Sequence, residues 1–526
     1  MEGRHSLTIV ALAISSIGCD ATGTSVDNRG DAIDGGAGSG DSGTSGTAGE
    51  GGEAGGMAGA GGTGTGGTGA GGAAGAGEEF VPEPPGSSGA LGFTYDPSLV
   101  RYVTTSGSDL ENGMTEATAW RSLSAAAQRA QPGWTIFVKA GTYGSEQVVF
   151  STSGTPAQPI RLVGYRSTPG DHPAVRSWAY PYTTNSAEIP VLDFGTRTAG
   201  MAIRLDEKSH VEVRNLQIEN YLIGVYGDGS THCLVENVSV TETGDPEQEY
   251  SGAGIKFTGG ASDNAVVNCV VGNSTSENLM IIGDRNKVLG CISYCNDAAS
   301  VAASTDYYLM TGGSHNIIAH NVAHRIGDVP HLGHGIGSKT RGPGHPSEHN
   351  LFQSNTAIGF KSSSFYVRHK DSRHNTFRFN TARDGLGAGF MVHDAAHHNL
   401  VEHHTTINQG RLFIFLDSGE DGAYSNSGED NIFRDIVAKN VYDVVFVLSD
   451  YLNPNAVASR NVFERITVDG GSVLFRVESM GADNVLKDSA ISNVSTFAQY
   501  GEGRSAGDIG FAYENVTWSA NGFADP

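Results

Sequence analysis

The sequence predicts an all-β solenoid, a parallel β-helix, and three features lead to that prediction. An asparagine recurs in one local frame, followed by a variable residue, two or three apolar residues and a second short strand. The shortest spacing of this frame, 22 to 25 residues, is one coil of a three-strand β-helix. An amphipathic helical segment precedes the repeat, and the open end of a solenoid needs such a cap. The frame asparagines are Asn264, Asn286, Asn316, Asn350, Asn375, Asn399, Asn431, Asn461 and Asn484.

The first 19 residues are typical of an export signal. Arg4 precedes an apolar run over residues 7–14, which is too short to span a bilayer, and small residues lead to Gly18 and Cys19. This pattern resembles a bacterial lipoprotein signal, and the resemblance implies that Cys19 is lipidated and anchors the protein to a membrane. An ordinary cleaved secretory signal is the alternative. Both predict an exported protein, either an outer-membrane or cell-surface lipoprotein or a periplasmic or secreted one.

Residues 20–94 are expected to form a disordered glycine-rich linker. Most of the excess among the 74 glycines lies between residues 35 and 77, where almost nothing apolar is larger than alanine. Such a segment cannot bury enough surface to offset its chain entropy. A glycine-rich coil of ~65 residues spans roughly 45 Å. We therefore predict a flexible tether, followed by one β-helix domain over residues 95–526.

The start of this domain has a characteristic order of elements. Residues 102–106 are expected to form a strand, residues 118–130 an amphipathic helix that Thr118 caps, and residues 132–143 a turn, an alternating strand and a tight glycine turn. This order resembles the N-terminal end of right-handed parallel β-helix proteins of the polysaccharide lyase type. There a helix covers the open end of the solenoid, so the resemblance implies a right-handed β-helix with an N-terminal capping helix.

The frame asparagines are expected to be structural. An asparagine at one fixed position of each coil suits an inward-turned amide ladder that satisfies the backbone groups of the turns. Cys269 and Cys291 each follow a frame asparagine by five residues, so we expect them on adjacent coils about 4.8 Å apart. That separation permits a disulfide, and a reduced, buried pair is equally compatible with it.

Charge is unevenly distributed along the chain. The formal net charge is −24, yet residues 331–412 hold nine Lys or Arg and five Asp or Glu, a local balance of +4. Eleven of the eighteen histidines also lie in this segment. A cationic, histidine-rich strip on an acidic protein suggests a site for an anionic ligand. The expected partner is an anionic polysaccharide rather than a nucleic acid, and the protein is expected to be a monomer.

Alternation sets the register of the second strand in each coil. The inward residues are predicted to be Ile336 and Ser338, Phe365 and Val367, Phe390 and Val392, and Ile414 and Leu416. The outward residues at the strand ends should then form one vertical row, because parallel coils stack at about 4.8 Å: Lys339, Arg368, His393 and Asp417. A second row of Tyr366, Met391 and Phe415 should expose an apolar and aromatic surface to sugar rings.

A lysine and an arginine on adjacent coils suit β-elimination of a uronic acid polysaccharide. The C5 proton lies next to a carboxylate and is weakly acidic, so an enzyme must supply a base and offset the growing negative charge. A lysine acts as such a base when neighbouring cations, here Arg341 and Arg368, lower its pKa. The leaving glycosidic oxygen then takes a proton from Arg368, from Tyr366 or from water.

Two coils of this segment carry motifs of a known family. Ser338-Lys339, Asn355-Thr356 and residues 365–369 (FYVRH) with Asp371 resemble the active-site coils of the chondroitinase B and alginate lyase group, polysaccharide lyase family 6. The resemblance implies that Lys339 is the Brønsted base and Arg368 the acid. His369 is expected to support Arg368 from the strand end.

Calcium-dependent members of that family have acidic ligands five and seven residues before the lysine. This chain has His334 and Leu332 there, so we expect no calcium bound in that way and no other cofactor. Arg341, His334 or His393 would then neutralise the substrate carboxylate. We also predict no zinc site, because His331 with His334, and residues 397–398 with 403–404, lie in turns without a fixed ligand geometry.

Three classes of function remain open at this point. They are a polysaccharide lyase, a C5-epimerase that shares the same proton abstraction, and a noncatalytic surface protein that binds glycans. A hydrolase is less well supported, because no two carboxylates fall on adjacent outward positions. Asp394 and Asp417 come nearest to such a pair.

Overall fold

The computed structural model describes residues 92–171, 182, 188–296, 298–340, 346–417, 426–449 and 455–519. The predicted signal with Cys19, most of the predicted linker, and Arg341 lie outside the described residues. In the part that is described, no helix has the length and apolar character needed to cross a membrane.

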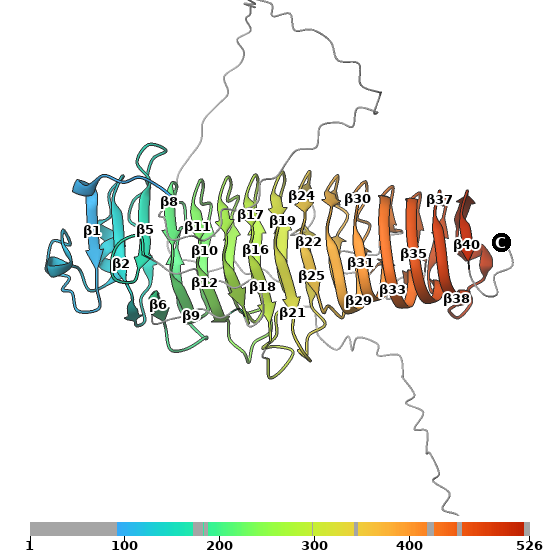
Figure 1. Cartoon of the computed structure of the whole chain (residues 1–526), viewed down its shortest axis with the longest axis horizontal. Helices are drawn as coiled ribbons and strands as arrows, with labels where there is room; N and C mark the ends of the chain where they lie inside the picture. The colour runs from blue at the N-terminus through green and yellow to red at the C-terminus, as the bar shows by residue number, and fades with distance from the viewer. Residues whose placement is uncertain are drawn as a thin grey trace, which may run out of the picture. The chain divides into compact units, whose positions relative to one another are not determined.

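Parallel strands stack coil upon coil, from β1 at the blue end to β40 at the red end (Figure 1). Each coil contributes up to three strands, which pair with the equivalent strands of the coils before and after it. The strands therefore form three columns around one continuous apolar interior. This is the predicted all-β, right-handed parallel β-helix.

The three columns are called here the site column, the first side column and the second side column. The site column contains β4 (Val148–Val149), β7 (Met201–Arg204), β10 (Ile223–Asp228), β13 (Ala253–Thr258), β16 (Glu277–Ile282), β19 (Tyr307–Gly312), β22 (His334–Lys339) and β26 (Ser363–Arg368). The first side column contains β1 (Val100–Val103), β2 (Thr135–Lys139), β5 (Ile160–Tyr165), β8 (Val211–Arg214), β11 (Leu234–Glu236), β14 (Ala265–Val267), β17 (Lys287–Leu289), β20 (Ile317–Ala319), β24 (Leu351–Gln353), β28 (Thr376–Arg378), β30 (Leu400–Glu402), β37 (Asn484–Lys487) and β39 (Phe511–Glu514). The second side column contains β3 (Gly141–Tyr143), β6 (Pro190–Asp193), β9 (Gln217–Tyr221), β12 (Ser239–Thr243), β15 (Val270–Gly272), β18 (Ile292–Cys295), β21 (Val322–Arg325), β25 (Thr356–Ile358) and β40 (Thr517–Ser519).

Toward the C-terminus, strands of neighbouring columns merge into long bent strands. These are β29 (Thr381–His393), β31 (Thr405–Leu416), β33 (Ile432–Ser449), β35 (Val462–Val477) and β38 (Ala490–Tyr500). Two small sheets lie beside them, formed by β23 (Ser347–Glu348) with β27 (Ser372–Arg373), and by β32 (Asn426–Glu429), β34 (Val457–Ser459) and β36 (Met480–Ala482). Short 3-10 helices occur at η1 (Pro97–Leu99), η2 (Glu116–Thr118) and η4 (Ala506–Asp508).

The predicted N-terminal helix is present but shorter. It is α1 (Leu123–Arg129), and its inner face buries Leu123, Ala126 and Ala127 in the interior of the solenoid. Its N-cap is Ser122, whose hydroxyl accepts a hydrogen bond from the Ala125 N–H. Thr118 was the wrong cap, because it ends η2 and forms a capping box with Thr115. The short helix η2 therefore precedes α1, and Thr118 takes part in the capping box of η2 instead of capping α1.

The frame asparagines form the predicted ladder at the turn between the site column and the first side column. Asn375 illustrates each rung: its backbone N–H and its Nδ2 both donate to Asn399 Oδ1, at 3.0 Å each. Its Nδ2 also donates to the Ser347 carbonyl at 2.9 Å, while its own Oδ1 accepts the Asn350 backbone N–H at 3.1 Å. The same contacts run from Asn264 to Asn484. Each amide thus satisfies backbone groups of two coils that no strand ladder reaches.

Cys269 and Cys291 occupy equivalent places on neighbouring coils, as predicted, since the residues that follow them pair in register. Both thiols are buried and free. They stand five residues beyond the frame asparagine, where later coils place a second asparagine ladder of Asn321, Asn355 and Asn380. The cysteines therefore fill an interior turn position, and burial raises the pKa of the Cys269 thiol well above its usual value.

The turns also account for part of the histidine enrichment. The residue before each frame asparagine has a positive φ, a conformation in which Asn, Asp and His are enriched. His315, His349, His374 and His398 occupy this place on successive coils and are exposed. The first three rings stack, with centroids 5.2 and 5.4 Å apart, and the His398 ring is tilted by 53° to that of His374 at 5.4 Å. These histidines therefore occupy one position of the turn, and this geometry accounts for their recurrence.

Candidate functional site

The predicted row exists over three coils. At the ends of β22, β26 and β29, Lys339 pairs with Arg368, and Arg368 pairs with His393. The fourth member is wrong, because His393 pairs with Leu416 rather than with Asp417. The coil of β31 is one residue shorter, as a register shift in its pairing with β29 between Gly385 and Ala388 shows. A slip of one residue sends every later side chain to the opposite face.

The same slip changes the second row. Its members are Tyr366, Met391 and Ile414, whereas Phe415 points into the interior with Phe413. This row is also not the exposed surface that was expected, because Tyr366 is 0 % exposed and Met391 is 3 % exposed.

Local packing explains why this row is covered. The Tyr366 ring lies over Gly337 on the coil before it, where a Cβ would lie 2.6 Å from the ring. Tyr307 and Met310 pack beside Tyr366 and complete a small apolar cluster on the outer face of the sheet. Tyr366 therefore forms part of the floor of the site and offers no free ring to a sugar.

One tyrosine that sequence reasoning missed joins the two cations. Tyr307, on β19, accepts hydrogen bonds at its hydroxyl from Lys339 Nζ at 3.2 Å and from Arg368 Nη1 at 2.8 Å. Lys339 Nζ also lies over the Tyr307 ring, 4.6 Å from its centroid. The His334 ring stacks on the Tyr307 ring, with centroids 5.0 Å apart and planes at 16°. Lys339 and Arg368 therefore converge on a single oxygen atom.

A buried carboxylate lies beneath the row. Asp394 is 0 % exposed, and its Oδ2 lies 2.6 Å from His393 Nδ1, 3.4 Å from Arg368 Nε and 3.6 Å from His369 Nδ1. His369 was expected to support Arg368 from the strand end, and both side chains lie near this shared carboxylate. Because an unpaired buried charge is costly, Asp394 holds the guanidinium of Arg368 in one orientation. Neither Asp394 nor the buried Asp417 is an outward-facing acid of the kind a hydrolase needs.

His393 in the row and His334 beside Tyr307 are uncharged near neutral pH. Burial, and next the positive charge of Arg368, lower the pKa of His393 to about 4. The same two causes hold the pKa of His334 well below its usual value. Both residues were expected to neutralise a substrate carboxylate, but neither brings a positive charge to it. His334 also bonds Ser363, with Nδ1 2.8 Å from the hydroxyl.

Acidic groups gather at the opposite end of the same strands. Glu277 pairs in register with Tyr307, and burial raises the pKa of its carboxyl. Asp306 is buried just before Tyr307, with Oδ1 3.4 Å from His331 Nδ1. The side chains of Lys339 and Arg368 reach back from the C-terminal strand ends to the Tyr307 hydroxyl. The positive charge of Lys339 there opposes the effect of burial on the pKa of Glu277, so the site combines two cationic side chains with nearby carboxyl groups.

The described residues contain no cluster of three or more His, Cys, Asp or Glu side chains placed to hold a metal ion. His334, which stands where calcium-dependent members of the resembled family carry an acid, is engaged with Tyr307 and Ser363. Independence from calcium stays a prediction.

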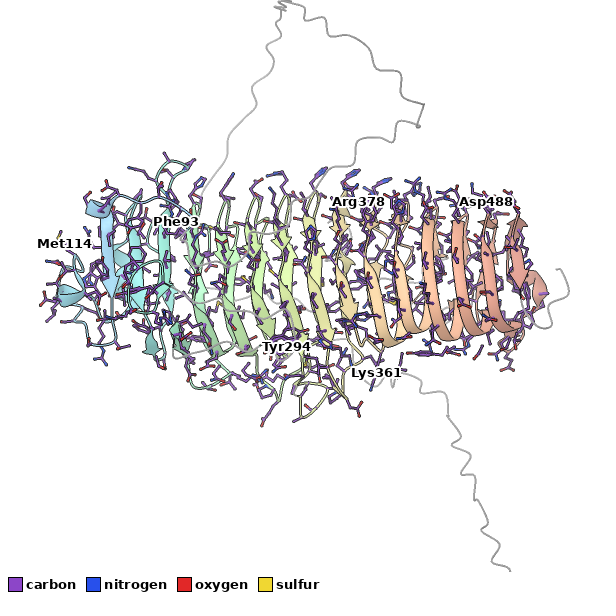
Figure 2. The ribbon with its side chains drawn as sticks, in the orientation of Figure 1. Phe93, Met114, Tyr294, Lys361, Arg378 and Asp488 are labelled. Carbon is purple, nitrogen blue, oxygen red and sulfur yellow. The ribbon has the colours of Figure 1, made fainter. Side chains whose placement is uncertain are left out.

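Three other cations of residues 331–412 form contacts away from the row. Arg373 pairs with Glu348 at the asparagine turn, and Arg378 contacts Gln353 in the first side column. Arg383, at the end of the second side column, pairs with Asp384. Figure 2 shows Arg378 and Lys361 at opposite edges of the solenoid. Part of the excess positive charge of the described residues is therefore spread around the coil, whereas Lys339 and Arg368 lie together in the row. A cavity of about 480 Å³ near Lys361 lies at the far end of β26 and is not lined by the row.

The similarity of this chain to known proteins lies in its fold. Residues 201–365 match the family model described as a right handed beta helix region. No protein of curated function matches this chain.

Solved structures with a similar fold include enzymes of different reaction types. Pectate lyase Pel9A is 16 % identical, with a TM-score of 0.45, covering 64 % of this chain and 83 % of its own. A mannuronic acid specific polysaccharide family 6 lyase from human gut microbiota is 13 % identical, with a TM-score of 0.45, covering 76 % and 89 %. The catalytic domain of a GH87 alpha-1,3-glucanase is 14 % identical, with a TM-score of 0.42, covering 84 % and 71 %. This chain is similar to them as a parallel β-helix.

Proposed function

We propose that the protein is an exported polysaccharide lyase that cleaves a uronic acid polysaccharide by β-elimination. The observation that carries the proposal is the convergence of Lys339 Nζ and Arg368 Nη1 on one point of an outer sheet face. An amine that can act as a base, next to a fixed guanidinium, suits a substrate whose reacting carbon lies beside a carboxylate.

Lys339 and Arg368 have different roles in the proposed reaction. The amine of Lys339 removes the C5 proton, and the electron pair of that bond forms the double bond between C4 and C5. The bond from C4 to the glycosidic oxygen breaks, and this oxygen takes a proton. Arg368, held by Asp394, is the fixed positive charge that faces the uronate carboxylate as its negative charge grows. His334 and His393 contribute shape and hydrogen bonds rather than charge.

The proposed export, partner, oligomeric state and lack of a cofactor are inferred from the sequence. The N-terminal signal makes the protein an exported one, attached to a membrane through Cys19 if that residue is lipidated. Its partner is an anionic polysaccharide, it acts as a monomer, and it needs no cofactor.

One alternative has an observation in its favour. Arg368 is 7 % exposed and His393 is 4 % exposed, so little of the row beyond Lys339 faces solvent. A noncatalytic protein that binds anionic glycans through an exposed edge would tolerate such covering. A C5-epimerase uses the same proton abstraction and differs in returning the proton to the opposite face of the sugar.

The test is incubation with alginate, polygalacturonate and chondroitin or dermatan sulfate. The ultraviolet absorbance of a conjugated double bond identifies elimination, inversion at C5 without absorbance identifies epimerisation, and binding alone identifies the noncatalytic protein. Lys339→Ala is expected to abolish elimination and to leave folding intact, since a partly exposed lysine contributes little to stability. The exposed Lys370→Ala is the matched control and should retain activity.

EDTA should leave the activity unchanged. Full activity of Lys339→Ala contradicts the mechanism, and loss of activity in EDTA contradicts the independence from metal.

A further inference from the structure

The elimination needs a proton donor for the leaving oxygen, and the geometry restricts the choice. Arg368, the acid implied by the family resemblance, is a poor donor, because a guanidinium is not deprotonated in proteins. It is also ion-paired to the buried Asp394. Its position suits a permanent cation rather than a group that releases a proton and recovers it in every cycle.

The other groups of the site are no better placed. Tyr366 and Tyr307 are both buried, at 0 % and 4 % exposed, but the Tyr366 hydroxyl donates to the Leu309 carbonyl at 3.4 Å, whereas the Tyr307 hydroxyl contacts Lys339 and Arg368. His334 and His393 have pKa values far below neutrality, so both imidazoles lack the proton that an acid would release. Among the described residues around the row, the Tyr307 hydroxyl is the group that carries a proton and touches both cations.

Tyr307 is also rigidly placed. Its ring packs in a cluster of three, stacked on His334 at 5.0 Å and edge-on to Tyr366 at 5.6 Å, while His334 and Tyr366 also contact each other at 5.4 Å. Because Lys339 and Arg368 both donate to the Tyr307 oxygen, the hydroxyl proton points away from them. Once Lys339 has taken the C5 proton, the Tyr307 oxygen accepts from an ammonium and a guanidinium, and two charged donors stabilise negative charge on that oxygen.

We propose that Tyr307 is the general acid of the elimination and that Lys339 returns the proton to it. This inference rests on the proposed function. Lys339 takes the C5 proton and becomes an ammonium, the double bond forms, and the bond from C4 to the leaving oxygen breaks. That oxygen takes the Tyr307 proton, leaving a phenolate beside two cations. The ammonium then gives its proton to the phenolate across the 3.2 Å contact, so both residues are restored without an outside acid.

The test compares two leaving groups. On a polyuronate, whose leaving group is a basic alkoxide, Tyr307→Phe should lower kcat by about 10²- to 10⁴-fold, the usual contribution of a general acid. On a synthetic uronide whose C4 substituent leaves as a nitrophenolate, the same variant should approach wild-type kcat, because that leaving group needs no proton. Tyr308→Phe is the matched control and should match wild type on both substrates, because its neighbouring ring points into the interior against Phe360.

The outcomes separate the inference from the proposed function. An equal loss on both leaving groups overturns the acid role and makes Tyr307 a positioning residue. Full polyuronate activity of Tyr307→Phe, together with inactive Lys339→Ala, overturns the inference and leaves the lyase intact. No product from wild type on any polyuronate overturns both. Circular dichroism of each variant establishes that it is folded before its kcat is interpreted.

Discussion

His404 should make the solenoid sensitive to mild acid. The side chain is 1 % exposed, with its ring edge-on to Phe365 and Phe390, and within the described residues neither ring nitrogen has a hydrogen-bond partner. Burial lowers its pKa from 6.5 to about 3. Between pH 6.5 and about 3, His404 is therefore protonated in the unfolded chain and neutral in the folded protein. The stability contributed by the neutral ring is present above pH 6.5 and is lost as the pH falls from there toward about 3.

The size of the effect follows from the two pKa values. The full gap corresponds to about 5 kcal/mol, and about 2 kcal/mol of it should be lost between about pH 7 and about pH 5. His404→Asn removes the titrating group and restores the residue type that Asn321, Asn355 and Asn380 provide at this place on the three preceding coils. The variant should lose about 2 kcal/mol less than wild type over that pH range.

Urea unfolding of both proteins at a series of pH values measures this difference, because all other titrating groups contribute equally to both curves. His404→Leu provides a second nontitrating side chain should the asparagine fail to fold. Parallel stability curves for wild type and variant would refute the reasoning, since they require that the folded protein accept the proton on His404 as readily as the unfolded chain.

Two further predictions concern the ladder and the site. Asn375→Ala should cost about 2 to 6 kcal/mol, since a buried backbone N–H and a buried carbonyl each lose a partner at about 1 to 3 kcal/mol apiece. In the same urea titration the exposed Asn440→Ala, which also breaks an asparagine pair, should change stability by less than about 0.5 kcal/mol, and equal losses would count against a structural ladder. Asp394→Ala should cost about 3 to 5 kcal/mol because it leaves Arg368 buried without its anion. A thermal midpoint unchanged from wild type would show that Arg368 has moved to solvent.

The coil repeat was predictable because its causes are local. An asparagine at a tight turn, a strand of alternating residues and a short connection lie within one stretch of about 22 to 25 residues. The places of Asn375 and of the cysteine pair followed from counting along that stretch. Counting also placed Lys339, Arg368 and His393 in one row, because β22, β26 and β29 end in the same register.

Counting residues from the frame asparagine gave the wrong register where a coil changes length and no sequence motif marks the change. The shorter turn before the second half of β31 moved Leu416 into the place predicted for Asp417. Tyr307 was missed for a related reason, because the loop between β18 and β19 separates it from its frame asparagine by an unusual distance. Aligning the apolar cores of β19 and β22, in which Leu309 pairs with Ile336, would have placed Tyr307 beside His334.

By itself, the sequence determined the repeat, the inward ladder and the presence of a lysine and an arginine on adjacent coils, since each depends on residues close together in the chain. The tertiary structure alone decided what surrounds those cations. Asp394 beneath Arg368, Tyr307 between Arg368 and Lys339, and the burial of Tyr366 all depend on which side chains meet across coils. These contacts between coils depend on loop lengths and on the stacking of coils at about 4.8 Å, and not on spacing along the chain.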